Sequence, residues 1–148
     1  TIGSGASCTV GVTFSPATGG VINGTLTFTD SAANSPQTVS LTGTGSTVAT
    51  ASPTSLSFGQ VRVGHASSAK TVTLTNTGGA SLTFSSITAS ASYSISSNTC
   101  GASLAAGANC TVGVTFTPAV KGTINGTLKF VDSALNSPQT VSLAGAGK

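Results

Sequence analysis

The stretch "CTVGVTFTPAVKGTINGTLKF" (residues 110–130) decides the fold, because it holds two β-strand patterns and the turn between them. In "CTVGVTF" the apolar residues alternate with Thr and Gly, which is typical of a half-buried strand. "TPAVKG" then supplies Pro and Gly for a turn over residues 118–122. Asn125–Gly126 also fits a hairpin, but a turn there would leave a strand of only about two or three residues. We therefore expect Gly126 inside the second strand, at a bulge.

The same stretch occurs a second time near the start of the chain. Residues 8–46 align without gaps on residues 110–148, at an offset of 102, and 29 of the 39 aligned residues are identical. A period of about one hundred residues is the size of one small domain. The chain therefore consists of a complete repeat (residues 47–148) preceded by a partial repeat (residues 1–46), the C-terminal part of another such domain.

The partial repeat supplies about three strands and half a core, which should not be stable alone. Two sources of the missing half remain open. The 148 residues can be part of a longer chain that contains the earlier strands. Alternatively, a neighbouring subunit completes the partial repeat by strand complementation or domain swapping.

Short runs with a period of two fill the complete repeat, and turn residues separate them. Such a pattern predicts an all-β fold, a sandwich of two sheets. No stretch shows a convincing helical period. The expected strands are "SLSFGQVRV", "KTVTLTNTG", "SLTFSSITA", "SYSIS", "CTVGVTF", "INGTLKF" and "TVSL".

Four segments carry a resemblance to a known family: "SLSFGQVRVG", "KTVTLTNTGGASLTFSSI", "NTCGASLAAGANCTVGVTFTP" and "GTLKFVDSALNSPQTVSLAGAG". They resemble the immunoglobulin-like repeats of the ASPM/Hydin type, called ASH domains, which are related to major sperm protein. The resemblance covers almost all of the complete repeat and again the partial repeat. It implies a seven-stranded immunoglobulin-like sandwich with a scaffolding or attachment role, and bacterial versions occur in tandem in large secreted or surface proteins. It carries over no catalytic residue, and His65 stands where the family more often has a small polar residue.

Composition argues against several partners. Only 5% of the residues are charged, and the five basic residues are scattered, so we expect no nucleic-acid binding. Ser, Thr, Asn and Gly interrupt every apolar run, so we expect no membrane span. One His and no Glu leave no acid/base constellation, which predicts a protein that is not an enzyme. Asp30 and Asp132 are equivalent positions, so each repeat has one acid, which we expect to cap its own turn. We expect no metal and no cofactor.

The three cysteines have a simple explanation within the repeat. Cys100 and Cys110 bracket a short Gly/Ala-rich loop, and the absence of nearby Cys or His ligands favours a disulfide over a metal site. The alternative is a pair of reduced, buried thiols in a cytosolic protein. Cys8 is equivalent to Cys110, and the residue equivalent to Cys100 would lie at position −2, before Thr1. Cys8 is therefore predicted to be unpaired because its repeat is truncated.

Repetition, a short-range disulfide and a nearly uncharged Ser/Thr-rich surface favour an extracellular or cell-surface array. We expect a structural repeat, a stalk, spacer or filament subunit, whose partners are neighbouring repeats or subunits. The alternatives are a binding or adhesion module for a protein or glycan, and an intracellular cytoskeletal scaffold of the same fold. Glycan attachment is a further expectation, because three sequons begin at Asn23, Asn109 and Asn125.

Overall fold

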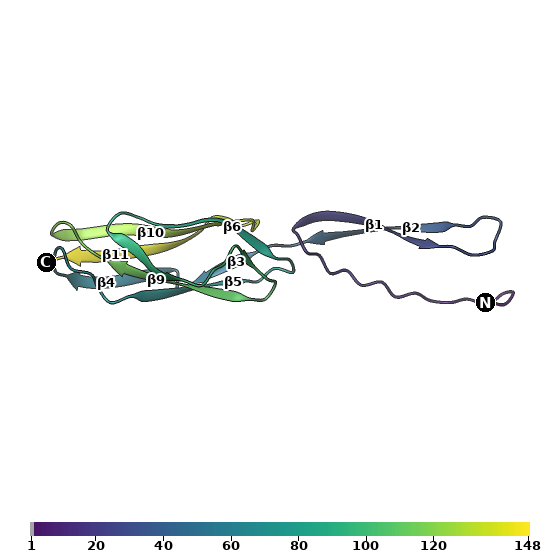
Figure 1. The fold of residues 1–148 in the computed structure, drawn as a ribbon, viewed down its shortest axis with the longest axis horizontal. Helices are drawn as coiled ribbons and strands as arrows, with labels where there is room; N and C mark the ends of the chain where they lie inside the picture. The colour runs from purple at the N-terminus through teal and green to yellow at the C-terminus, as the bar shows by residue number, and fades with distance from the viewer. Residues whose placement is uncertain (1) are drawn as a thin grey trace.

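The computed structural model describes residues 2–148 and contains β-strands joined by turns (Figure 1). The molecule is elongated, with a sandwich at the C-terminal end and a two-stranded hairpin extending from it. The strands are β1 (Gly20–Phe28), β2 (Gln37–Gly45), β3 (Ala49–Ser52), β4 (Ser55–Val61), β5 (Lys70–Asn76), β6 (Leu82–Ala89), β7 (Tyr93–Asn98), β8 (Ser103–Leu104), β9 (Asn109–Phe116), β10 (Gly122–Asp132) and β11 (Gln139–Gly147).

The complete repeat forms two sheets. One sheet has the order β4-β11-β10-β6-β8 and the other has the order β3-β5-β9-β7. Neighbouring strands are antiparallel except β4 and β11, which are parallel. Each of the seven expected strands is present, but the expected total of seven is wrong, because β3 and β8 bring the described strands of this repeat to nine. Those two strands have four and two residues, too short for an alternating pattern to mark them.

Apolar side chains from both sheets meet in one core. Its largest members are fully buried and come from β5, β6, β9, β10 and β11. Three aromatic rings of this core lie close together: Tyr93 stacks on Phe116 with ring centroids 4.8 Å apart, and the ring of Phe58 lies 5.5 Å from that of Tyr93. Burial of this apolar surface is the main favourable term in folding the repeat.

The turn between β9 and β10 confirms the expected position at residues 118–122, and Gly126 lies inside β10. The expected bulge at Gly126 is wrong: Gly126 pairs regularly with Leu143, and the register of β10 shifts instead between Val131 and Asp132. A different contact requires the glycine. A Cβ at Gly126 would lie 2.8 Å from Cε2 of Tyr93, so the ring occupies the space of a side chain.

The partial repeat is less regular than its copy. β1 and β2 pair with the same register as β10 and β11, but the expected third strand is absent from the described residues. The segment 7–14, equivalent to the whole of β9, runs beside the hairpin without pairing (Figure 1). In the complete repeat β9 is held by β5 on one side and β7 on the other. The partial repeat has no equivalent of either strand within residues 2–46, so the backbone of segment 7–14 has no ladder to join.

Replacing Gly145 with alanine should lower the free energy of unfolding by about 1–3 kcal/mol, because an added methyl group overfills a packed core. A Cβ at Gly145 would collide with the ring of Phe116, which is fully buried. Gly43→Ala is the matched control: its Cβ would lie 2.7 Å from Cζ of Phe14, but that ring is half exposed and free to turn away. Urea unfolding measures the free energy of unfolding of both variants. Equal losses would contradict the conclusion that the buried ring of Phe116 leaves no room for a side chain at residue 145.

Candidate functional site

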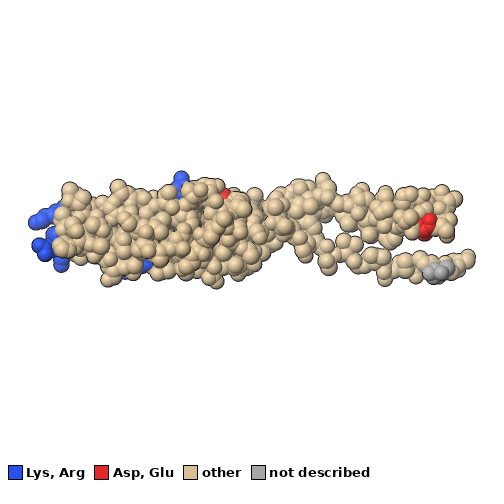
Figure 2. All heavy atoms as spheres, in the orientation of Figure 1, with Lys and Arg blue, Asp and Glu red and all other residues tan. Residues whose placement is uncertain are grey.

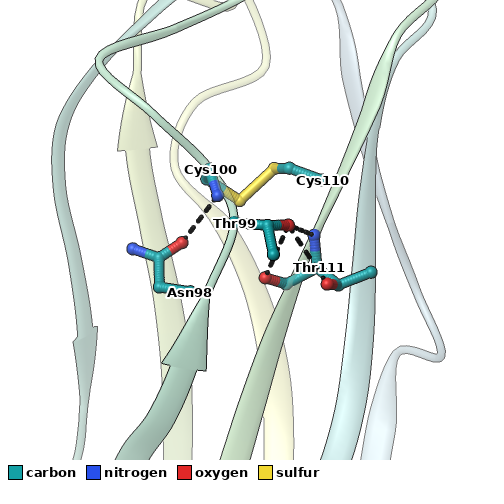
Figure 3. The surroundings of a disulfide bond; sticks show 5 residues. All are labelled: Asn98, Thr99, Cys100, Cys110 and Thr111. Atoms are coloured by element: carbon teal, nitrogen blue, oxygen red, sulfur yellow. Dashed lines mark hydrogen bonds between the residues drawn. A yellow bond between two sulfur atoms is a disulfide. The ribbon is translucent and has the colours of Figure 1, made fainter.

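The disulfide joins Cys100, two residues after the end of β7, to Cys110 near the start of β9, with a sulfur–sulfur distance of 2.06 Å (Figure 3). Hydrogen bonds hold the segment around it. The Asn98 Oδ1 accepts from the backbone N–H of Cys100 at 2.8 Å, and the Thr99 Oγ1 accepts from the backbone N–H of Thr111 at 2.8 Å. The predicted pairing is therefore present in the structure. Cys8, the counterpart of Cys110 in the partial repeat, is an exposed free thiol among the described residues.

The two Asp residues cap their own turns, as expected. The Asp132 Oδ1 accepts from the backbone N–H of Ala134 at 2.8 Å, and Asp30 does the same with Ala32. The Ser hydroxyl five residues on accepts from the backbone N–H of each Asp. The side chain of Asp132 is buried, and its second oxygen has no hydrogen-bond partner within residues 2–148.

His65 follows β4 in a turn, where its backbone N–H donates to the carbonyl of Arg62 at 3.0 Å. Within residues 2–148, no group of three or more His, Cys, Asp and Glu side chains lies close enough to hold a metal ion. No helix in this part of the chain is long and apolar enough to cross a membrane. The side chains of Asn23, Asn109 and Asn125 are exposed, and their glycosylation stays a prediction.

The sequence placed the boundary between the two repeats at residues 46 and 47 but did not predict the contacts made there. Only residues 46–48 separate β2 from β3. Thr47 is 2% exposed; its hydroxyl donates to the carbonyl of Ser133 at 3.0 Å, and its own carbonyl accepts from the N–H of Leu135 at 2.9 Å. On the other side, a Cβ at Gly19 would lie 3.0 Å from the Thr47 Oγ1. Thr47 therefore contacts both repeats.

Further hydrogen bonds hold the residues on either side of Thr47. The carbonyl of Ser46 accepts from the N–H of Ala80 at 3.2 Å, and the carbonyl of Val48 accepts from the N–H of Thr77 at 2.8 Å. The Asn136 side chain makes two hydrogen bonds to the backbone of Ala49. The Asn136 Oδ1 accepts from the N–H of Ala49 at 3.1 Å, and the Asn136 Nδ2 donates to the carbonyl of Ala49 at 2.7 Å. Asn136 belongs to the segment "DSALNSPQ" (residues 132–139), which recurs as "DSAANSPQ" at residues 30–37.

Charged side chains are few, and they lie at the ends of the molecule and at isolated points along the sandwich (Figure 2). Basic side chains gather at the C-terminal end, and most of the surface in this view carries no charge (Figure 2). Backbone hydrogen bonds bring Lys148 next to Val61 and Val63, so Arg62 lies in the same region. The flanks thus offer little Coulombic repulsion to a neighbouring molecule.

An apolar surface of the partial repeat is open. Val10, Val12, Phe14 and Val39 are 48–55% exposed, whereas their equivalents in the complete repeat are fully buried. A pocket of about 320 Å³ lies between segment 7–14 and the β1–β2 hairpin. It is lined by residues 12–14, 22–24 and 41–43.

Burial raises the pKa of the Tyr93 hydroxyl above its ordinary value of about 10. The neutral hydroxyl donates to the carbonyl of Ile124 at 2.7 Å. The neutral Tyr93 hydroxyl therefore makes its full contribution to stability at pH values below the pKa it has in the unfolded chain. That contribution is lost as pH rises through the higher pKa it has in the folded protein.

Comparison with known proteins agrees with this fold. A protein of unknown function from Porphyromonas gingivalis W83 superposes with a TM-score of 0.58 at 13% identity, over 86% of this chain and 66% of that chain. The ASH/PapD-like domain 7 of human CEP192 superposes with a TM-score of 0.55 at 16% identity, over 70% of this chain and 87% of that chain. This chain thus spans just under two thirds of the length of the Porphyromonas protein.

No curated protein sequence matches the chain. The profile of the family described as "Abnormal spindle-like microcephaly-assoc'd, ASPM-SPD-2-Hydin" (ASH) matches residues 45–140, which is more than half of the chain. That match agrees with the fold shared with the CEP192 domain. The protein belongs to the ASH family of immunoglobulin-like domains.

Proposed function

We propose that this chain is a non-catalytic, structural part of an extracellular tandem array of ASH repeats, acting as a stalk, spacer or filament subunit. The observation that carries the proposal is the junction at residues 46–48. A flexible linker would leave its backbone groups to water. Here the carbonyls of all three linking residues accept hydrogen bonds from the complete repeat, and Thr47 is buried between the repeats. These bonds hold the linking residues on the complete repeat, and Thr47 also lies close to Gly19 of the partial repeat, which supports an end-to-end joint with a fixed angle.

A rigid junction matters for a spacer because it sets length. Domains on flexible linkers occupy many orientations, so their end-to-end distance is short and variable. Repeats that pack on their neighbours extend in one direction instead. The elongated arrangement of the hairpin and the sandwich agrees with such an extension (Figure 1).

The Cys100–Cys110 disulfide supports an extracellular location, because such bonds persist in oxidising compartments. Alkylation of freshly isolated protein, before any reduction, tests this part of the proposal. Cys8 should react and the other two cysteines should not. Three reactive thiols would contradict the extracellular location.

Amide hydrogen exchange tests the rigid junction in the unmodified chain. The amides of Thr77, Ala80 and Leu135 donate to the linking carbonyls, so we expect them to exchange on the order of 100-fold more slowly than in an unfolded chain. Asn136→Ala should speed their exchange. Asn34→Ala, the equivalent change in the partial repeat, should not, because within residues 2–148 the Asn34 side chain bonds only Gln37 of its own turn. Exchange at unprotected rates in the unmodified chain would reject a rigid spacer.

A further inference from the structure

The loop at residues 77–80 and the turn at residues 133–137 both hold the linking residues of the junction. The loop follows β5, and its backbone amides donate to the carbonyls of Ser46 and Val48 at 2.8–3.2 Å. The turn joins β10 to β11, and it bonds both the carbonyl and the hydroxyl of Thr47. β5 and the β10–β11 pair belong to different sheets, so both layers of the sandwich contribute to the junction.

The 77–80 loop lies directly on the linking residues. A Cβ at Gly78 would collide with the carbonyl of Ser46, so no side chain fits between the two segments. Asn76, the fully buried last residue of β5, holds the loop in this position. The Asn76 Oδ1 accepts from the N–H of Gly78 at 3.0 Å, and the Asn76 Nδ2 donates to the carbonyl of Ala80 at 2.8 Å. The geometry of the loop therefore depends on the orientation of the Asn76 side chain.

The disulfide-bonded loop, residues 101–109, holds Asn76 from the other side. The Asn76 Nδ2, the Asn76 backbone N–H and the Asn76 carbonyl all bond to this loop, at distances of 2.9–3.1 Å. Their partners are Leu104, Ala105, Gly107 and Ala108. A continuous path of hydrogen bonds thus runs from the disulfide-bonded loop through Asn76 to the junction.

The disulfide-bonded loop reaches the turn at residues 133–137 by a longer path. β8 lies in that loop and pairs with the first residues of β6, and the backbone of Thr83 in β6 bonds Ser133. β6 is also paired with β10 over residues 84–89, so it keeps its place in the sheet without β8. Opening the disulfide should therefore disturb the 77–80 loop much more than the turn.

We propose that the Cys100–Cys110 disulfide controls the stiffness of the junction through Asn76, so that the junction responds to redox conditions. A dithiol that reduces the bond supplies two electrons and two protons. The sulfur–sulfur bond breaks, each cysteine gains an S–H, and the dithiol becomes a disulfide. The freed residues 101–109 then let the Asn76 amide turn, and the 77–80 loop loosens its hold on the linking residues. This control rests on the proposed function, because only a rigid junction can be loosened.

Amide hydrogen exchange in the double variant Cys100→Ala/Cys110→Ala tests the proposal. Both cysteines are buried, so a reductant reaches them slowly and the substitutions open the loop more completely. We expect the exchange rate of Ala80 relative to that of Leu135 to rise on the order of 10-fold, because Ala80 belongs to the loop and Leu135 to the turn. The unmodified chain, once reduced by a dithiol, should show the same change. An unchanged ratio would overturn the proposal.

Val141→Ala is the matched control for a general loss of stability. Val141 is fully buried in β11, and its truncation leaves a cavity that lowers stability without touching the path through Asn76. General unfolding speeds both amides alike, so the ratio of Ala80 to Leu135 should stay as it is in the unmodified chain. If Val141→Ala changes this ratio as much as the double variant does, the disulfide has no special effect on the junction. If the double variant unfolds as a whole, the bond acts on the entire repeat and the proposal is wrong.

Backbone order parameters from NMR relaxation measure the stiffness of the junction directly. For the Ser46 amide we expect about 0.85 in the unmodified chain and less than about 0.6 in the double variant, while Thr47 keeps a higher value than Ser46. A Ser46 amide that stays rigid in the double variant would contradict the proposal.

The unmodified chain separates this proposal from the rigid spacer itself. Unprotected amides at Thr77, Ala80 and Leu135 while the disulfide is closed would reject the rigid spacer. Slow exchange that opening the bond does not alter would leave the rigid spacer in place and reject the redox control alone.

Discussion

Replacing Asn76 with alanine should lower the free energy of unfolding by about 3 kcal/mol or more, because the change leaves several buried backbone groups without partners. Asn76 is fully buried at the end of β5. Its Nδ2 donates to the carbonyls of Ala80, Leu104 and Ala105, at 2.8, 3.0 and 3.1 Å. Its Oδ1 accepts from the N–H of Gly78 at 3.0 Å. One side chain thus holds together two loops of the complete repeat.

Urea unfolding at equilibrium measures the loss, with Asn125→Ala as the matched control. Asn125 belongs to the same repeat, but its side chain is exposed and makes no hydrogen bond to another described residue. Exposed positions of this kind change stability by about 0.5 kcal/mol or less. If Asn76→Ala costs no more than Asn125→Ala, the two loops are held by other contacts.

Removing the disulfide should have a comparable effect. The double variant Cys100→Ala/Cys110→Ala should lose about 2.5–3 kcal/mol on the chain-entropy model for a loop of this length. The two cysteines are 10 residues apart in the sequence, so the crosslink restricts a short loop of the unfolded chain. Both sulfurs also lie in the core, so the loss includes their packing.

Cys8→Ala is the control for the disulfide, because this thiol is exposed and unpaired in residues 2–148. Adding reductant should lower the urea midpoint of unfolding by the same amount in the unmodified chain and in Cys8→Ala. The double variant should not respond to reductant. A reductant effect that persists in the double variant would show that another bond is responsible.

The strands were predictable because alternation is a local property. Val112, Val114 and Phe116 read as one face of a strand, and the structure buries all three. β3 was missed because "ATAS" is only four residues long, too short for its alternation of small residues to stand out. The role of Gly126 was misjudged for another reason. The atom that excludes a side chain there belongs to Tyr93, on another strand, so nothing next to the glycine indicates it.

Polar residues with structural roles were harder to find than apolar ones. Asn76, Thr47 and Asn136 all bond to backbone carbonyls or amides. Any residue can supply such a group, so the partner leaves no trace in the sequence. The disulfide was predictable because cysteines are rare here and their spacing is short. The similarity of residues 8–46 to residues 110–148 was visible from the 102-residue offset alone.

The parallel pairing of β4 with β11 has a mechanical consequence. β4 lies near the N-terminal end of the complete repeat and β11 ends at Gly147. If the two ends of the repeat are pulled apart, the two strands are drawn in opposite directions along their length. The hydrogen bonds that join residues 142–147 of β11 to residues 55–61 of β4 are then loaded together in shear, rather than opened one after another. This topology resists stretching along the same axis on which the repeats are joined.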